Sequence, residues 1–201
     1  MGEISSGVTT MVFNFLILGL TGNTGIAAYG VVANVALVAT AVFNGISQGS
    51  QPLLSDYYGK NDDKSVQKIL RLSIITGIAA AVLIILVTNL IPDVIVAVFN
   101  NENNAEMASY AVFGVQLYFT GFLFAGFNII GTGFLSATES AAWAFITSVL
   151  RGFVAISLCA LLLSALFGMT GVWLAFPVAE FITAVLMVIA IAQNVRKMRT
   201  K

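Results

Sequence analysis

The sequence has no histidine, one cysteine and three prolines among its 201 residues. Without histidine it lacks the commonest metal ligand and general base, and the side chain that titrates most readily near neutral pH. The cysteine, Cys159, cannot form a disulfide within the chain, and its apolar neighbours predict a small core residue. We also find no nucleophile–base pair, phosphate-binding loop or cluster of metal ligands. The sequence therefore indicates neither an enzyme nor a protein with a metal or organic cofactor.

Charge is also scarce in this chain. Charged residues make up 9% of the sequence, with nine Lys and Arg against nine Asp and Glu, and the formal net charge is zero. This balance leaves no basic excess for binding nucleic acid. Apolar residues make up 59%, and the mean hydropathy is +0.97. Since a soluble domain of this length needs a far more charged surface, we expect membrane lipid to surround the protein.

Six apolar stretches are long enough, or nearly so, to cross a hydrocarbon core about 30 Å thick. Lipid offers no hydrogen bonds to open backbone groups, so each stretch is expected to be a helix, and the runs are too continuous for barrel strands. We predict an all-α membrane protein, one six-helix lobe with helices at about 4–20, 26–54, 69–91, 107–135, 141–167 and 172–195. Gly22 and Gly168 lie in the first and fifth expected turns. The first helix is the shortest, and we interpret it as clipped.

The distribution of Lys and Arg predicts the orientation of these helices. The basic residues outside the fifth helix fall in the second loop and the tail: Lys60, Lys64, Lys68, Arg71, Arg196, Lys197, Arg199 and Lys201. The loops after the first, third and fifth helices have none, and their acids are Asp93, Glu102 and Glu106. Because short cytoplasmic loops are enriched in Lys and Arg, we expect both termini and the Lys60 loop to be cytoplasmic.

Polar side chains recur at helical spacing on three of the predicted helices. They are Glu3, Ser6, Thr10 and Asn14 on the first, Thr40, Asn44, Gln48 and Gln51 on the second, and Gln116, Thr120 and Asn128 on the fourth. Polar groups in lipid are costly and usually face a bundle interior or a wet cavity. Hydrogen bonds between helices are a common alternative, worth about 1 kcal/mol each. Because the stripes span several turns, we favour the wall of a hydrated cavity.

Two charges lie well inside predicted helices. Arg151 and Glu180 fall near mid-depth of the fifth and sixth helices, which are antiparallel neighbours. Pairing would offset the cost of burying either charge, so we interpret them as a structural clamp in preference to a proton or cation relay. Pro177 is expected to bend the sixth helix and could serve as a hinge. Gly45 and Gly49 form a G-x-x-x-G pattern, which predicts a close-packing face.

Four short motifs occur along the chain in a definite order. They are Ile26-Ala-Ala-Tyr29-Gly30, then Gly45-Ile-Ser-Gln-Gly49-Ser-Gln51-Pro52 with Tyr58-Gly59, then Ser148-Val-Leu-Arg151, and last Gly171-Val-Trp173-Leu-Ala-Phe-Pro177-Val-Ala-Glu180. In order and spacing they resemble the eighth, eleventh and twelfth helices of multidrug and toxic compound extrusion (MATE) transporters. The resemblance covers essentially the whole chain and places it in the carboxyl-terminal half of that family.

The resemblance implies one lobe of a two-lobed carrier in the bacterial inner membrane. Such carriers export amphipathic, often cationic, drugs in exchange for Na⁺ or H⁺. The partner would be a missing amino-terminal lobe or a second copy in a homodimer. Some members have a coupling carboxylate in the tenth helix, where this chain offers only Gln116, Thr120 and Asn128. Glu3 is then the one acid on the polar stripes.

Two other interpretations stay open. The chain could be a membrane scaffold or remnant that does not transport and only packs against partner helices. It could also be half of a lipid-linked-sugar flippase of the same superfamily, for which more cationic residues are expected on the cavity face. Convergence of the three polar stripes on one face would favour the carrier. In that interpretation Arg151, Pro177 and Glu180 hold or bend the last two helices.

Overall fold

The computed structural model describes the backbone of residues 2–100 and 103–198 and the side chains of residues 9–100 and 103–198. These ranges hold helices and no strands, so the predicted all-α architecture is confirmed. The elements are α1 (Gly2–Gly59), α2 (Asp63–Leu90), α3 (Pro92–Ala97), α4 (Ala105–Tyr118), the 3-10 turn η1 (Phe119–Gly121), α5 (Phe122–Ala137), α6 (Ala141–Val149), the π-helical η2 (Leu150–Ala155) and α7 (Ile156–Met198).

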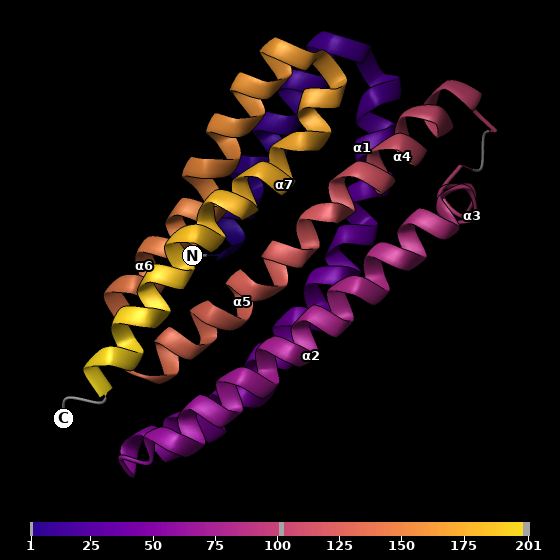
Figure 1. Cartoon of the computed structure of the whole chain (residues 1–201). Coiled ribbons are helices and arrows are strands. Elements are labelled where there is room, and N and C mark those ends of the chain that lie inside the picture. Colours follow the sequence, from indigo (N-terminus) through magenta and orange to yellow (C-terminus); the bar gives the residue numbers. More distant parts are fainter. Residues whose placement is uncertain (1, 101–102, 199–201) are drawn as a thin grey trace.

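Helix α1 is folded back on itself at Gly22. The backbone angles of Gly22 are φ 64° and ψ −153°, outside the helical region. The rings of Phe13 and Tyr29 stack with centroids 5.2 Å apart. On a straight helix a separation of sixteen residues would be roughly 24 Å. The two parts of α1 therefore form an antiparallel hairpin, which is visible in Figure 1.

Helix α7 has a second hairpin of the same kind at Gly168. This glycine has φ 58° and ψ −134°. A methyl group on Gly171 would collide with the carbonyl oxygen of Leu163, although the two residues would be about 12 Å apart on a straight helix. The segment that begins with α6 and η2 therefore runs to Gly168 and returns as the rest of α7.

The number of continuous helices differs from the six expected. In the part of the chain that the structure describes, four stretches are long and apolar enough to cross a membrane: Thr9–Gly59, Asp63–Leu90, Ala105–Ala137 and Ala141–Met198. The difference arises at Gly22 and Gly168, where each turn is so tight that the helical hydrogen bonding resumes at once. The chain consequently passes through the bundle in six segments joined as four continuous stretches.

Helix α2 begins earlier than its apolar run predicts, at Asp63 instead of about residue 69. The side chain of Asp62 caps it by accepting a hydrogen bond from the backbone N–H of Ser65 at 3.1 Å. The Ser65 hydroxyl also donates to Asp62, at 2.7 Å, and these bonds lower the pKa of the Asp62 carboxyl. The polar residues of this loop thus form the first turn of a helix that continues into the apolar stretch.

Packing in the bundle depends on aromatic rings seated against glycines. A methyl group on Gly126 of α5 would meet the ring of Phe43 of α1, and one on Gly114 of α4 would meet the indole of Trp173 of α7. Phe43 and Trp173 are completely buried. Many Leu, Ile and Val side chains on the outside of the bundle are instead exposed, as expected where lipid covers a helix.

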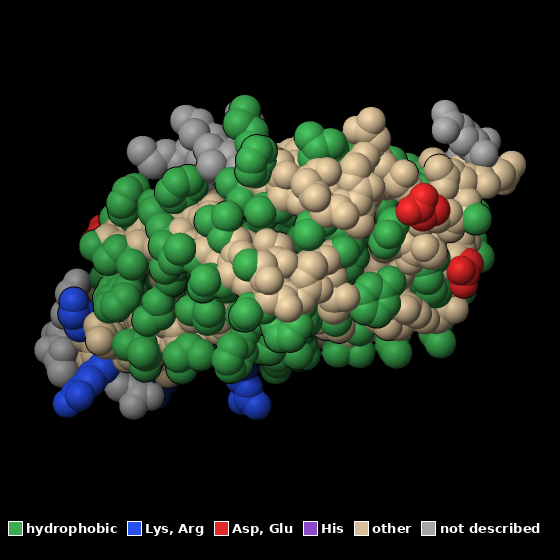
Figure 2. Space-filling model, turned by 90° about the horizontal axis from the view of Figure 1, so that it is seen from above, with side chains coloured by type: hydrophobic (Ala, Val, Ile, Leu, Met, Phe, Trp, Pro, Cys, Tyr) green, Lys and Arg blue, Asp and Glu red, His purple; other side chains and the backbone are tan. Residues whose placement is uncertain are grey.

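Apart from Arg151 and Glu180, the described charged side chains lie towards the two ends of the molecule. In Figure 1 the α1–α2 turn and the C-terminus are at one end, and the two hairpin turns and α3 are at the other. Figure 2 shows Lys and Arg in the half of a largely hydrophobic face towards one end, and the more prominent acidic side chains at the opposite end. The described basic residues outside the bundle, Lys60, Lys64, Lys68, Arg71, Arg196 and Lys197, all belong to the first of these ends.

Candidate functional site

The structure pairs the two charges that the sequence places at matching depth. Arg151, on η2, donates from Nε to Oε1 of Glu180 on α7, at 2.5 Å. The Glu180 side chain is 4% exposed and that of Arg151 26% exposed. The predicted contact between the fifth and sixth segments is therefore present. The low exposure of Glu180 limits competition from water, so its carboxylate depends on Arg151 for a counterion.

Asn128 is not on an open cavity face, which corrects its predicted position. It is fully buried, and its Nδ2 donates to Oε2 of Glu180 at 2.7 Å and to the Glu180 carbonyl at 2.9 Å. Twelve residues of α-helix separate it from Gln116 by about 120° around the axis. The three residues of η1 turn more tightly and add roughly 60°. Gln116 and Asn128 therefore lie on opposite sides of this segment.

Arg151 lies in a short π-helical segment that interrupts the fifth pass through the bundle. Residues Leu150–Ala155 form this segment, η2, between α6 and α7. The wider turn displaces carbonyl groups from the usual hydrogen bonds, and the carbonyl of Gly152 accepts a bond from the Thr9 hydroxyl at 3.0 Å. Single π-helical turns are frequent at functional sites. Here the turn links the buried ion pair to the first part of α1.

Pro177 lies on α7, three residues before Glu180. Within α7 the one position with non-helical backbone angles is Gly168, so the helix continues through Pro177. A methyl group on Gly121 of η1 would meet the Cα of Pro177 at 2.9 Å. The backbone of Pro177 thus packs closely against the tight turn of η1. A hinge at Pro177 stays a prediction.

The second part of α1 presents polar side chains on the outside of the bundle. Asn44 and Gln48 are exposed, and Gln51 is half-buried and donates to the Ser47 hydroxyl at 3.3 Å. A hollow of about 370 Å³ opens beside them, lined by Gln48, Gln51, Pro52, Ser55, Ser136 and Ala137. The sequence analysis missed Ser136, because a single hydroxyl near a helix end has no periodic signal. We call this hollow and the exposed Asn44 and Gln48 the polar face.

The other candidates have varied surroundings. Thr10 is exposed and Asn14 is half-buried on the first part of α1. Gln116 is half-buried on α4, and the exposed Thr120 of η1 donates to the carbonyl of Leu117 at 2.7 Å. The Glu3 side chain lies outside the described residues. No group of three His, Cys, Asp or Glu that could hold a metal ion occurs among the residues described.

Gly45 and Gly49 do not pack against another described helix of this chain, so the predicted close-packing face has no partner within it and stays a prediction. Both are exposed, and a methyl group on either would meet no atom within 4 Å. They lie beside Asn44 and Gln48 on the polar face. The G-x-x-x-G surface is therefore open, and it could accept a helix from outside this lobe.

The described residues form a bundle of long apolar helices with a polar face and a largely buried ion pair, features that membrane transporters share. The family model described as MatE matches residues 3–161. The chain belongs to this family, the multidrug and toxic compound extrusion transporters, so the resemblance inferred from the four motifs is confirmed. The family is one of transporters and not of enzymes.

Curated proteins with similar sequences are multidrug export proteins. The chain is 28% identical over 184 residues to the multidrug export protein MepA of Staphylococcus saprophyticus and 30% identical over 182 residues to that of Staphylococcus haemolyticus. Each match covers 90% of this chain and 39% of the relative, so the chain spans about two fifths of the length of the curated relatives it matches.

Solved structures share the fold at lower identity. A MATE family multidrug resistance transporter in an outward-facing conformation has a TM-score of 0.93 at 11% identity, covering 100% of this chain and 45% of that one. An inward-facing conformation of such a transporter has a TM-score of 0.94 at 11% identity, and the match covers 100% of this chain and 46% of that one. The lobe fold is thus matched almost equally well in both conformations.

Proposed function

We propose that this chain is the carboxyl-terminal lobe of a cation-coupled multidrug antiporter in a bacterial inner membrane. The lobe provides one wall of the substrate cavity, and amphipathic, often cationic, compounds leave the cell in exchange for Na⁺ or H⁺. The other wall comes from an amino-terminal lobe or from a second copy of this chain. Both termini and the Lys60 loop are cytoplasmic in this proposal, because the basic residues gather at that end.

The observation that carries the proposal is the polar face of α1. Asn44 and Gln48 are exposed in a bundle whose other outward helix surfaces carry exposed Leu, Ile, Val and Phe. Polar amides that face lipid cost free energy, whereas the same amides in a hydrated cavity are solvated and can contact a substrate. Gly45 and Gly49 between them would allow a substrate or a partner helix to approach the backbone closely.

The ion pair has a structural role in this proposal. Arg151, Glu180 and Asn128 join η2, α7 and α5, three of the elements that form the lobe. Since outward- and inward-facing relatives match this fold about equally well, we infer that the lobe moves as a rigid body. A buried, fully engaged carboxylate suits that purpose better than exchange of an ion during each cycle.

A non-transporting scaffold makes a different prediction for the polar face. In a scaffold, helices from a partner would cover Asn44 and Gln48 permanently, and water would not reach them. In a carrier, the same positions are wet in at least one conformation. The flippase alternative is disfavoured by charge, because the exposed positions of the polar face carry amides and no Lys or Arg.

The reactivity of cysteines introduced on the polar face distinguishes a carrier from a scaffold. In a Cys159→Ala background of the assembled carrier, either a dimer or the chain joined to an amino-terminal lobe, Gln48→Cys should react with a membrane-impermeant maleimide in proteoliposomes, and ethidium should slow the reaction. The matched control is Leu83→Cys on α2, which is 62% exposed and should face lipid without reacting. Equal failure of both positions to react would support the scaffold. A reaction at Gln48→Cys that ethidium does not slow would contradict a drug-binding cavity.

A further inference from the structure

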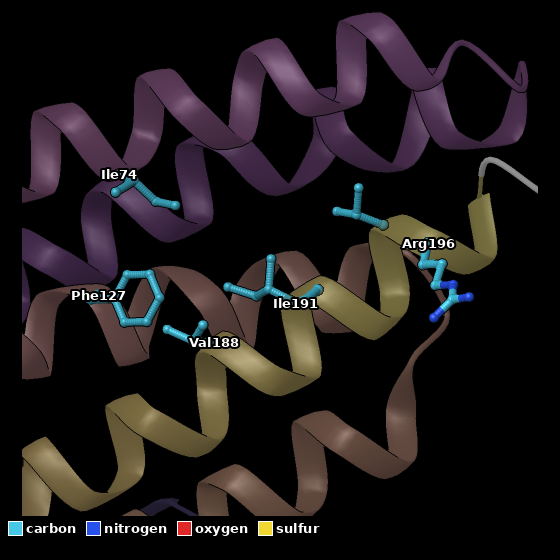
Figure 3. Close-up of a pocket in the computed structure, with 7 residues that line it drawn as sticks. Ile74, Phe127, Val188, Ile191 and Arg196 are labelled. Atoms are coloured by element: carbon cyan, nitrogen blue, oxygen red, sulfur yellow. The ribbon is translucent and has the colours of Figure 1, made fainter.

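A second hollow lies between α2, α5 and α7, on the outside of the bundle. It has a volume of about 640 Å³, within the ~300–1,000 Å³ range of sites that hold small molecules. Ile74 of α2 and Phe127 of α5 line it together with Val188, Ile191, Val195 and Arg196 of α7. Figure 3 shows the apolar side chains following one another along the gap and Arg196 near its C-terminal end. We call this hollow the lipid groove.

The lipid groove opens away from the polar face. Phe127 of α5 lines the groove, whereas Ser136 of the same helix lines the hollow of the polar face. Nine residues are two and a half turns of helix, so these two positions point about 180° apart. The neighbours of Phe127 agree with this direction, because Ile130 packs on Gly77 of α2 and Gly131 on Met187 of α7. A partner lobe on the polar face would therefore leave the lipid groove facing the bilayer.

Length and charge indicate what the groove would hold. Its α7 wall from Val188 to Arg196 is about 12 Å long at 1.5 Å per residue. One leaflet contributes about 15 Å, half of a ~30 Å hydrocarbon core, so the wall runs through most of one leaflet. The lining is apolar until it reaches the exposed guanidinium of Arg196, at the basic end of the molecule. The apolar part of the groove therefore matches an acyl chain, and Arg196 at the membrane surface matches an anionic headgroup.

We propose that the lipid groove binds an anionic phospholipid of the leaflet at the basic end, with an acyl chain between α2 and α7 and its phosphate on Arg196. Basic pockets between membrane helices on the cytoplasmic side commonly hold such headgroups. Arg suits this task because its planar fork of donors matches a phosphate. Arg71 lies one turn from Ile74 towards the same end of α2, on an adjoining face, and adds to the positive potential. The bound lipid would join α2 to α7 independently of transport.

The test is photolabelling of the chain in liposomes. Phosphatidylglycerol and phosphatidylcholine analogues carry the same diazirine on one acyl chain, and mass spectrometry locates the products. We expect labels on the peptides that contain Phe127 and Val188, with about fivefold more from phosphatidylglycerol. Arg196→Gln should remove most of this preference for phosphatidylglycerol. Val188→Trp, at a position 56% exposed, should fill the groove and reduce labelling by both.

Lys68→Gln is the matched control. Lys68 is an exposed cation at the same end of the molecule, but it lies six residues from Ile74, about 120° around α2. The preference for phosphatidylglycerol should survive in this variant. Equal labelling by both lipids in the unmodified chain would overturn the proposal, as would equal losses in Lys68→Gln and Arg196→Gln. Strong labels elsewhere with none in the groove would show that a helix of a partner or second copy covers it, which also overturns the proposal.

Discussion

At the scale of single residues, a buried carboxylate with both oxygens engaged joins three elements of the lobe. Arg151 donates to Oε1 of Glu180, and Asn128 donates to Oε2. Removing a charge from water costs several kcal/mol, and attraction within a pair repays this only with good geometry and further hydrogen bonds. Asn128 provides such a bond from a third element. Loss of any one of the three residues therefore strands a buried polar group.

Removal of one partner of the ion pair should destabilise the lobe strongly. We expect Arg151→Met to lower the free energy of unfolding by about 3–5 kcal/mol, because it leaves the Glu180 charge buried without its counterion. The double variant Arg151→Met/Glu180→Met should lower the free energy of unfolding by less than Arg151→Met alone. The charge swap Arg151→Glu/Glu180→Arg should recover part of the stability lost in the single variant. Unfolding in detergent, followed by circular dichroism, measures these differences.

The exposed pair Lys60–Asp56, at 2.6 Å, provides the control for that experiment. Water and salt screen this pair, so Lys60→Met should leave the unfolding transition nearly unchanged. If Arg151→Met behaved like Lys60→Met, the buried pair would have no structural role, and the relay interpretation of Arg151 and Glu180 would gain support.

The sequence predicted the pairing of Arg151 and Glu180 but not the role of Asn128. Depth along two antiparallel helices can be counted from the sequence, and a lone charge in lipid needs a partner, so that contact follows from general physics. The side of a helix to which Asn128 points depends on local winding. The 3-10 turn η1 changes that winding, and nothing in Phe119–Gly121 marks it as different from α-helix.

At the scale of the elements, two glycines determine how the helices fold back. Gly22 and Gly168 have positive φ with ψ near −150° and −130°, a region that only glycine enters without strain. Neither would bring an added methyl group within 4 Å of another atom. Glycine is therefore required at these positions by the backbone angles and not by close packing of neighbouring atoms. The sequence placed both turns correctly, because Gly22 lies in a polar run and Gly168 ends an apolar one.

Replacement of either turn glycine should destabilise the hairpin it forms. We expect Gly22→Ala to lower the free energy of unfolding by about 1–3 kcal/mol, the usual strain of a side chain in this region of backbone space. Gly19→Ala is the control, since Gly19 is helical and exposed, also with nothing within 4 Å, and alanine favours a helix. Thermal unfolding in detergent compares them. A Gly22→Ala variant as stable as Gly19→Ala would contradict the backbone argument.

At the scale of the whole molecule, the lobe has two charged ends, an apolar side and one polar face. Composition and the spacing of apolar runs predicted the membrane environment, and four motifs predicted the family. The three polar stripes predicted the polar surface of the molecule only in part. The structure brings Gln48 and Gln51 of α1 together with Ser136 of α5, while Asn128 turns inwards. In the proposed carrier a second lobe lies opposite the polar face, and the sequence of this chain contains no direct information about that lobe.

The orientation of the molecule can be tested at its two ends. In a Cys159→Ala background, we expect Glu106→Cys to react with a membrane-impermeant maleimide in intact cells, and Lys64→Cys to react only after permeabilisation. Both native residues are exposed, so access to the reagent is limited by the membrane alone. The expectation follows from the enrichment of short cytoplasmic loops in Lys and Arg. Labelling in the reverse order would show that the basic end is outside.

The chain expressed as a monomer should not export drugs. Alternating access moves one lobe against another around a shared site, and a single lobe has no opposing wall, so Asn44 and Gln48 would face lipid. A homodimer could close the cavity by placing two polar faces together across a two-fold axis, since symmetric dimers are the commonest oligomers.

The measurement is ethidium efflux from proteoliposomes, driven by a Na⁺ or proton gradient, together with the mass of the protein in detergent. We expect efflux only from a dimer or from the chain joined to an amino-terminal lobe, and Gln48→Leu should reduce it, whereas Gln193→Leu, an exposed glutamine at the basic end, should not. Vigorous gradient-driven efflux by a proven monomer would show that the pathway lies within this single lobe and not between two.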